Sequence, residues 1–291
     1  MKTYLDCIPC FVRQALDAAR HARMDAIQQE YLIRRVLQEI SLMRLNESPP
    51  VMGSKIYALI RELSGERDPY ELIKDRSNAY ALELFPNLHE EVVSSENPFE
   101  TALRFAMAGN VIDFGAASTV SDEMILQTLK NAREAALPED SIREFRNTAG
   151  KAASILYIGD NAGEIVFDRL LLEQLPTERV TFVVRGEPVI NDATITNADR
   201  AGIMKIVNVI DSGSAAPGIL LDDCSAGFRR AFYDSDLIIA KGQGNYESLS
   251  EADANITFLL MAKCPVIARD IGCEVGSFII RNSYVCDAKP R

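Results

Sequence analysis

The sequence predicts an α/β protein, in which a three-layer domain around a mostly parallel sheet follows an all-helical N-terminal domain. Two observations predict this. Up to about residue 150, apolar residues recur at helical spacing, as in Phe11 and Ala15. Beyond residue 152, short unbroken apolar runs alternate with helical stretches, an order typical of parallel strands between two layers of helices. The expected domains are therefore 1–150 and 151–291.

Seven helices are expected in the first half of the chain. Prolines separate them and lie near helix starts, where a missing backbone N–H costs little. The expected ranges are 8–22, 26–44, 51–63, 70–85, 98–112, 121–134 and 139–149. No repeat of 20–50 residues and no low-complexity linker is evident, so we expect the two halves to pack together.

The second half is expected to supply the sheet. Its apolar runs are continuous rather than alternating, which predicts strands buried on both faces. The expected strands are Ser154–Ile158, Val180–Val184, Lys205–Ile210 and Leu237–Ala240, with Thr257–Met261 and Val266–Ala268 as further strands. Helices are expected between them at Glu164–Gln174, Ile195–Ala201, Leu221–Tyr233 and Tyr246–Asp253.

Composition and charge exclude several classes of protein. Hydrophobic residues make up 47% of the 291 residues and charged ones 25%, which excludes disordered and collagen-like chains. Lys and Arg number 31 against 42 Asp and Glu, a net charge of −11, and no basic run occurs. Nucleic acid is therefore not an expected partner. A small anionic substrate would need a local cation or a metal ion in its site.

Cysteine usage and hydropathy bear on the compartment. No apolar run reaches the roughly 18 residues of a membrane span, so no membrane partner is expected. The N-terminal sequence lacks the apolar stretch and cleavage site of a signal peptide. Six cysteines are too sparse for a disulfide scaffold. These features predict a cytoplasmic protein with reduced thiols.

The sharpest local pattern is Gly-Asp-Asn-Ala-Gly-Glu at 159–164, between an expected strand and an expected helix. Ordinary turn chemistry explains such residues, because Asp and Asn cap helices and accept backbone N–H bonds. The glycine spacing of dinucleotide and P-loop motifs is absent. Two oxygen ligands, Asp160 and Asn161, at the end of a strand suggest a site for a hard cation instead.

Two further strands end in polar side chains that favour the cation site. Arg185 and Asp192 follow the second strand, and Lys241 follows the strand at 237–240. Because ligands bind outside the carboxyl ends of parallel strands, we expect these side chains to converge with Asp160 at one edge. Gly242, Gly244 and Asn245 follow Lys241; they either form a simple strand-to-helix turn or let backbone amides approach a phosphate.

Three motifs carry a resemblance: the strand followed by GDNAGE, then RGxPxxND at 185–192, then KGxxNxE at 241–247. In this order they resemble the damage-control phosphatase family, also known as domain of unknown function 89. Cys7-Ile8-Pro9-Cys10 resembles the CxxC of its first subfamily. The resemblance runs from residue 4 to the C-terminal region. It implies a helical part on a Rossmann-like domain and removal of phosphate from small phosphorylated metabolites, sugar phosphates or damaged nucleotides, supported by Mn²⁺, Ni²⁺, Co²⁺ or Mg²⁺.

Carried over to this chain, the resemblance implies roles for single residues. The metal ligands would be Asp160, Asn161 and Asp192, with Asn161 also near the substrate. Substrate contacts would come from Lys241, Gly242, Gly244 and Asn245, with Arg185 as the next candidate for the phosphate and Asn110 and Asp113 for the leaving group. The catalytic residues would be Asp160, Asp192 and Lys241. Either Asp160 or a water attacks phosphorus. Cys7 and Cys10 are expected to have a structural or auxiliary role.

Two other functions fit parts of the pattern. A methyltransferase could bind S-adenosylmethionine on the loop at 159–163, although Asp160 and Asn161 stand where glycines are expected. A non-catalytic nucleotide-binding protein could use the same pocket. Binding of labelled cofactor tests the first function, and phosphate release that a chelator abolishes tests the second.

Overall fold

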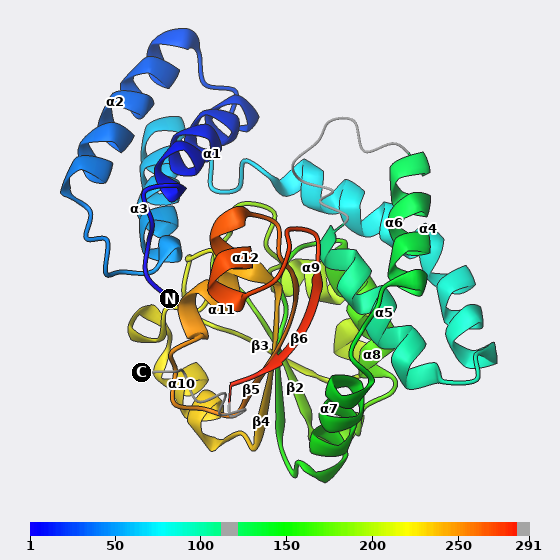
Figure 1. Cartoon of the computed structure of the whole chain (residues 1–291). Coiled ribbons are helices and arrows are strands. Elements are labelled where there is room, and N and C mark those ends of the chain that lie inside the picture. Colours follow the sequence, from blue (N-terminus) through cyan, green and yellow to red (C-terminus); the bar gives the residue numbers. More distant parts are fainter. Residues whose placement is uncertain (112–121, 284–291) are drawn as a thin grey trace.

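The structure, a computed structural model, describes residues 1–111 and 122–283 (Figure 1). Its first part is helical, as predicted. The helices are α1 (Cys7–His21), α2 (Ala26–Leu42), α3 (Pro49–Ser64), α4 (Glu71–Ser94), α5 (Pro98–Val111), α6 (Asp122–Glu134) and α7 (Glu139–Lys151). Local signals set several ends: Asp25 and Gln28 form a capping box at the start of α2, and Gly65, with a φ of 70°, ends α3.

The second part contains a mostly parallel sheet of six strands in the order β3-β2-β1-β4-β5-β6, confirming the α/β fold class. The strands are β1 (Ile155–Ile158), β2 (Val180–Val184), β3 (Asn208–Asp211), β4 (Leu237–Lys241), β5 (Ile256–Met261) and β6 (Phe278–Asn282). All neighbours pair in parallel except β5 and β6. Since β1 lies between β2 and β4, the strand order reverses there, which is where open sheets of this type bind ligands.

Helices and 3₁₀ turns connect the strands. The helices are α8 (Glu164–Leu172), α9 (Ile195–Arg200), α10 (Ala226–Asp234), α11 (Gly242–Leu249) and α12 (Pro265–Ile271), and the 3₁₀ turns are η1 (Thr177–Arg179), η2 (Ile203–Lys205) and η3 (Leu221–Asp223). Within the described residues, no helix is long and apolar enough to cross a membrane.

Several expected boundaries were wrong. The predicted strand Val266–Ala268 lies inside α12, where Pro265 begins the helix and Gly272 ends it in the left-handed region. The predicted strand from Lys205 begins only at residue 208, after η2. The expected helix Leu221–Tyr233 is η3 followed by α10, which begins after the N-cap Ser225.

Three more elements differ from the prediction. Helix α4 continues past Pro86 to residue 94, because the apolar Leu88 and Val92 of its second half are buried in the core and offset the missing hydrogen bond. Strand β6 was not predicted at all. Helix α11 begins at Gly242 rather than at Tyr246, so the glycines after Lys241 form a helical turn and not a loop.

Residues of the sheet alternate between two cores. On one face, residues such as Tyr157 and Phe182 pack with helices α4 to α9; on the other, residues such as Ile158 and Phe258 pack with α10 to α12. Helices α1 to α3 form a third core, which also takes in Val189 from the loop after β2. These three helices lie together beside the sheet in Figure 1. A domain boundary at residue 150 stays a prediction, since α4 to α7 share a core with the strands.

Candidate functional site

The loops after β1 and β2 pair with each other and so place the candidate ligands together. Asn161 and Asp192 form an isolated antiparallel bridge. The N–H of Ala162 donates to the carbonyl of Asn191 (2.8 Å), and the N–H of Ala193 donates to that of Asp160 (2.8 Å). Asp160 and Asp192 therefore meet although they are 32 positions apart in the sequence, as the prediction of convergence requires.

Arg185 joins the two aspartates. Its side chain is only 1% exposed; Nε donates to Asp192 Oδ2 at 2.6 Å and Nη2 to Asp160 Oδ1 at 3.4 Å. Both aspartates are buried, at 8% and 4% exposure. Arg185, expected only as the next candidate for the phosphate, thus lies at the centre of the site.

Burial has the largest effect on the pKa of both aspartates. It raises the pKa of Asp160 well above its usual range, and the charges of Asp192 and Glu164 raise it further. Burial also raises the pKa of Asp192, against the opposing effect of the Arg185 guanidinium. A single guanidinium thus bridges two buried carboxylates. A divalent cation would supply the charge that Arg185 alone does not, so the donor set fits such an ion.

Asn161 supplies the third oxygen. Its Nδ2 donates to Asp160 Oδ2 and to Glu164 Oε2, both at 3.0 Å. Since Nδ2 makes both of these hydrogen bonds, the carbonyl oxygen Oδ1 is available to a cation. Two carboxylates and a carboxamide are hard ligands of the kind that Mg²⁺ and Mn²⁺ prefer. Among the described residues, no three His, Cys, Asp or Glu side chains gather into a ready-made metal cage.

Lys241 is placed differently from the prediction of a substrate contact. It is fully buried, and Nζ donates to Glu164 Oε1 (2.7 Å), Asp168 Oδ1 (2.5 Å) and the carbonyl of Ala106 (2.8 Å). Burial lowers the pKa of Lys241, but the two carboxylates outweigh this and raise it above its ordinary value. The ammonium stays charged, and protein atoms satisfy its three N–H groups.

Asp168 completes this buried network. Its Oδ1 also accepts a hydrogen bond from the hydroxyl of Tyr157 at 2.8 Å. Burial raises the pKa of Asp168 to about 6, although Lys241 opposes the shift. Because Glu164 contacts both Lys241 and Asn161, the network connects β4 to the candidate ligand loop.

The residues after Lys241 have packing roles in the structure. A side chain at Gly244 would clash with the backbone carbonyl of Pro217, so glycine permits this close approach. Asn245 Nδ2 donates to the carbonyl of Lys241 (2.7 Å) and to that of Gly159 (3.3 Å), which holds the ends of β4 and β1 together. Gly242, with a φ of 80°, opens α11.

The remaining predicted residues lie elsewhere or outside the described part. Asn110 is in the last turn of α5, whose Gly109 approaches Glu164 closely, and Asp113 lies outside the described residues. Cys7 and Cys10 lie in the first turn of α1. Burial raises the pKa of both thiols, and the Cys264 thiol raises it further. Neither thiol is therefore activated as a nucleophile.

Three residues near the site were missed in the sequence. Asn78 on α4 accepts from the N–H of Gly163 (2.6 Å) and donates to the carbonyl of Asn197 (3.0 Å), so it anchors the ligand loop. The charges of Lys263, after β5, and of Lys74, on α4, lower the pKa of Asp160 and of Asp192 respectively. A lone Asn or Lys in a helix or a loop carries no motif that would single it out.

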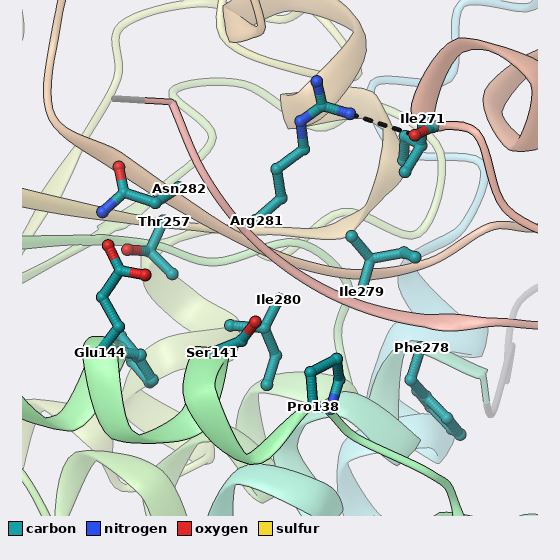
Figure 2. Close-up of a pocket in the computed structure, with 11 residues that line it drawn as sticks. Pro138, Ser141, Glu144, Thr257, Ile271, Phe278, Ile279, Ile280, Arg281 and Asn282 are labelled. Atoms are coloured by element: carbon teal, nitrogen blue, oxygen red, sulfur yellow. Dashed lines mark hydrogen bonds between the residues drawn. The ribbon is translucent and has the colours of Figure 1, made fainter. Parts of the chain in front are cut away.

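A separate cavity of about 380 Å³ lies between α7 and β6 (Figure 2). Its lining includes Thr257, Ile280 and Arg281, and the Arg281 guanidinium donates to the backbone carbonyl of Ile271 at 3.4 Å. It contains none of the candidate metal ligands. The candidate site is therefore the group around Asp160 and Asp192.

Known proteins resemble this chain over almost its full length. A family model described as a damage-control phosphatase ARMT1-like domain matches residues 3–279. A damage-control phosphatase from Archaeoglobus fulgidus is 38% identical over 236 residues, covering 79% of this chain and 81% of that protein. One from Pyrococcus horikoshii is 33% identical over 292 residues, covering 98% and 99%. The crystal structure of a DUF89 family protein from P. horikoshii superposes with a TM-score of 0.86 at 31% identity, covering 97% of this chain and 99% of that one.

Proposed function

The chain belongs to the damage-control phosphatase ARMT1-like family, and on that basis we propose that it is a metal-dependent phosphomonoester hydrolase acting on small phosphorylated metabolites. Sugar phosphates and damaged nucleotides are the proposed substrate classes. The observation that carries the proposal is the convergence of Asp160, Asn161 and Asp192 where the strand order reverses.

We propose that these three side chains hold the metal ion, with Mn²⁺, Ni²⁺, Co²⁺ and Mg²⁺ as candidates. A divalent metal, when bound, stabilises the charge on phosphoryl oxygens. Arg185 supports the ligand set because it fixes both carboxylates at once. Glu164 orients Asn161, and Lys241 holds Glu164 in turn. Such outer contacts commonly decide metal affinity.

Lys241 is thereby a positioning residue in this proposal rather than a contact to phosphate. Contact with a substrate would require it to exchange buried hydrogen bonds to two carboxylates. The exposed Lys263 is a better candidate to neutralise phosphate charge, because its own charge acts on Asp160. Arg185, whose Nε and Nη2 bind the two aspartates, is likewise a positioning residue at the metal site.

Attack by water fits the site better than attack by Asp160. Arg185 and Asn161 each donate a hydrogen bond to one oxygen of Asp160, which weakens both oxygens as nucleophiles. Hydrolysis of a phosphate ester made chiral at phosphorus with oxygen isotopes distinguishes the two routes. Inversion at phosphorus supports a single attack by water, and retention supports two displacements through an aspartyl phosphate at Asp160.

We propose assignment to the first subfamily because Cys7 and Cys10 form a CxxC that resembles its motif; both residues lie at the start of α1. Neither thiol belongs to the group around Asp160. We propose that the motif has an auxiliary role and takes no part in the chemistry.

Phosphate release from a panel of sugar phosphates and nucleotides tests the proposed function. The purified protein is stripped with a chelator and assayed with each of the four metals. We expect release that depends on added metal and is lost in Asp160→Asn, with Lys205→Met as a control on the exposed surface. Release that persists with chelator and in Asp160→Asn would contradict the proposal, as would binding of S-adenosylmethionine without any release.

A further inference from the structure

A second cavity adjoins the candidate metal site. Its volume is about 400 Å³, and it lies between the start of α4 and the segment 185–200. Arg185 lines this cavity, whereas Asp160, Asn161 and Asp192 do not. Since Nε and Nη2 of Arg185 bind the two aspartates, the guanidinium separates the cavity from the metal ligands. We refer to it as the α4–α9 cavity.

Two buried cations in its wall have unused N–H groups. Arg185 Nη1 has no hydrogen-bond partner among the described residues. Lys74 Nζ is ion-paired with the Asp68 carboxylate, and one such contact leaves other N–H groups of the ammonium without an acceptor among the described residues. Both side chains are only 1% exposed. Buried donors without acceptors are costly, so their presence in a cavity wall indicates a ligand that accepts hydrogen bonds.

The charges around the cavity favour an anion inside it. The acidic side chains of the lining are either paired or exposed: Asp68 pairs with Lys74 and Asp75 with Arg200, while Glu66 and Glu71 are exposed. The fully buried charged residues of this lining, Lys74 and Arg185, are both cations, and each keeps N–H groups that its carboxylate partners do not use. Lys74 also lies close enough to Asp192 for its charge to lower the pKa of that carboxyl, which places the cavity beside the proposed metal site.

We propose that the α4–α9 cavity binds a second oxyanion, a carboxylate or a phosphate, of the same substrate molecule, held by Lys74 and Arg185. This inference rests on the proposed function, since the ester phosphate is taken to occupy the site at Asp160 and Asp192. It narrows the substrate class to phosphate esters that carry another anionic group. Arg185 contacts both parts of the site and couples them.

Direct binding tests the cavity independently of hydrolysis. Inorganic phosphate is titrated by calorimetry into the full chain after chelator treatment. We expect Lys74→Met to weaken binding by at least about tenfold, the loss of one charge-assisted hydrogen bond. Lys74→Arg keeps the cation and should bind within a few-fold of the parent, and the exposed Lys151→Met is a control. Equal affinity in the parent and Lys74→Met would overturn the proposal.

Kinetics with two substrates then tests whether the cavity binds a second anionic group of the substrate. p-Nitrophenyl phosphate carries one anionic group and a hexose bisphosphate carries two. Lys74→Met should raise KM for the bisphosphate at least about tenfold more than KM for p-nitrophenyl phosphate. Equal effects on both substrates would overturn the proposal and leave the phosphatase activity standing. No hydrolysis by the parent would refute the proposed function, while the phosphate titration still decides the cavity.

A crystal structure with tungstate tests the α4–α9 cavity even if the Lys74 variants do not fold. Tungstate imitates phosphate and scatters strongly, so crystals of the parent protein can be soaked without any substitution. We expect tungstate in contact with Arg185 Nη1 and Lys74 Nζ. An α4–α9 cavity without tungstate, at a concentration that inhibits the enzyme, would overturn the proposal.

Discussion

Lys241 and Glu164 form a fully buried ion pair, with 2.7 Å between Nζ and Oε1, and Glu164 Oε2 accepts a hydrogen bond from the Asn161 side chain. Through Glu164, the Lys241 ammonium at the end of β4 therefore helps to fix the side chain of Asn161, a candidate metal ligand after β1. Lys241 ends β4, and Glu164 begins α8 after the neighbouring parallel strand β1, so the two residues meet although they are 77 positions apart in the sequence.

We expect Lys241→Met to destabilise the protein strongly. Removing the ammonium leaves Glu164 and Asp168 buried without their cation, and breaking a buried pair typically costs about 3–5 kcal/mol. Urea unfolding measures the change in the free energy of unfolding. A change below about 1 kcal/mol, together with a higher KM, would instead indicate that Lys241 binds substrate.

Asp192→Asn is expected to weaken Mn²⁺ binding before it affects the chemical step. The variant replaces a carboxylate ligand by an amide of the same shape and keeps an acceptor for Arg185. Metal titrations followed by kinetics at saturating Mn²⁺ should show partial rescue by excess metal. Unchanged Mn²⁺ affinity would remove Asp192 from the ligand set.

The raised pKa of Asp168 predicts that the protein loses stability as pH rises. Its pKa in the folded protein is about 6, above the ordinary value of 3.8, so the folded state binds more protons than the unfolded state between these values. The contribution of Asp168 to stability is therefore present at low pH and is lost as pH rises from about 4 to about 6. Relative to Asp168→Asn, the parent should lose unfolding free energy across this window, by chemical denaturation at each pH. A difference in unfolding free energy between the parent and Asp168→Asn that does not change with pH would contradict the raised pKa of Asp168.

Lys263→Met is expected to raise KM for monophosphate esters by about tenfold with little effect on stability. The lysine is exposed, and its charge reaches Asp160. Lys205→Met, another exposed lysine, is the matched control. Steady-state kinetics and thermal unfolding of both variants measure the two effects, and an unaltered KM would exclude Lys263 from the phosphate site.

The double variant Cys7→Ser/Cys10→Ser should retain phosphatase activity within a few-fold. Both cysteines lie in the first turn of α1, and burial keeps their thiols protonated. Activity with saturating Mn²⁺ is compared with that of Asp160→Ala. Complete loss in a folded double variant would show that the motif takes part in the reaction.

Sequence alone predicts the meeting of Asp160 and Asp192, because both follow strands whose carboxyl ends share one edge. It does not predict the environment of Lys241. The three acceptors of its ammonium come from α5 and α8, and no local pattern specifies how those helices pack. Likewise, the apolar run at Val266–Ala268 suits a strand or one face of a short helix equally well, and Pro265 and Gly272 decide for the helix.

Val189 is buried in the core of helices α1 to α3, yet it lies only three residues before Asp192 in the chain. The carbonyl of its neighbour Pro188 accepts a hydrogen bond from Arg61 of α3 (3.0 Å), and the next residue, Ile190, has a φ of 45° that a β-branched side chain rarely adopts. Helices α1 to α3 thus hold the loop after β2 in a strained conformation, and Asp192, a proposed metal ligand, lies at the end of this loop. Inactivating substitutions should accordingly arise in α3 as well as at the sheet edge, by letting this loop relax.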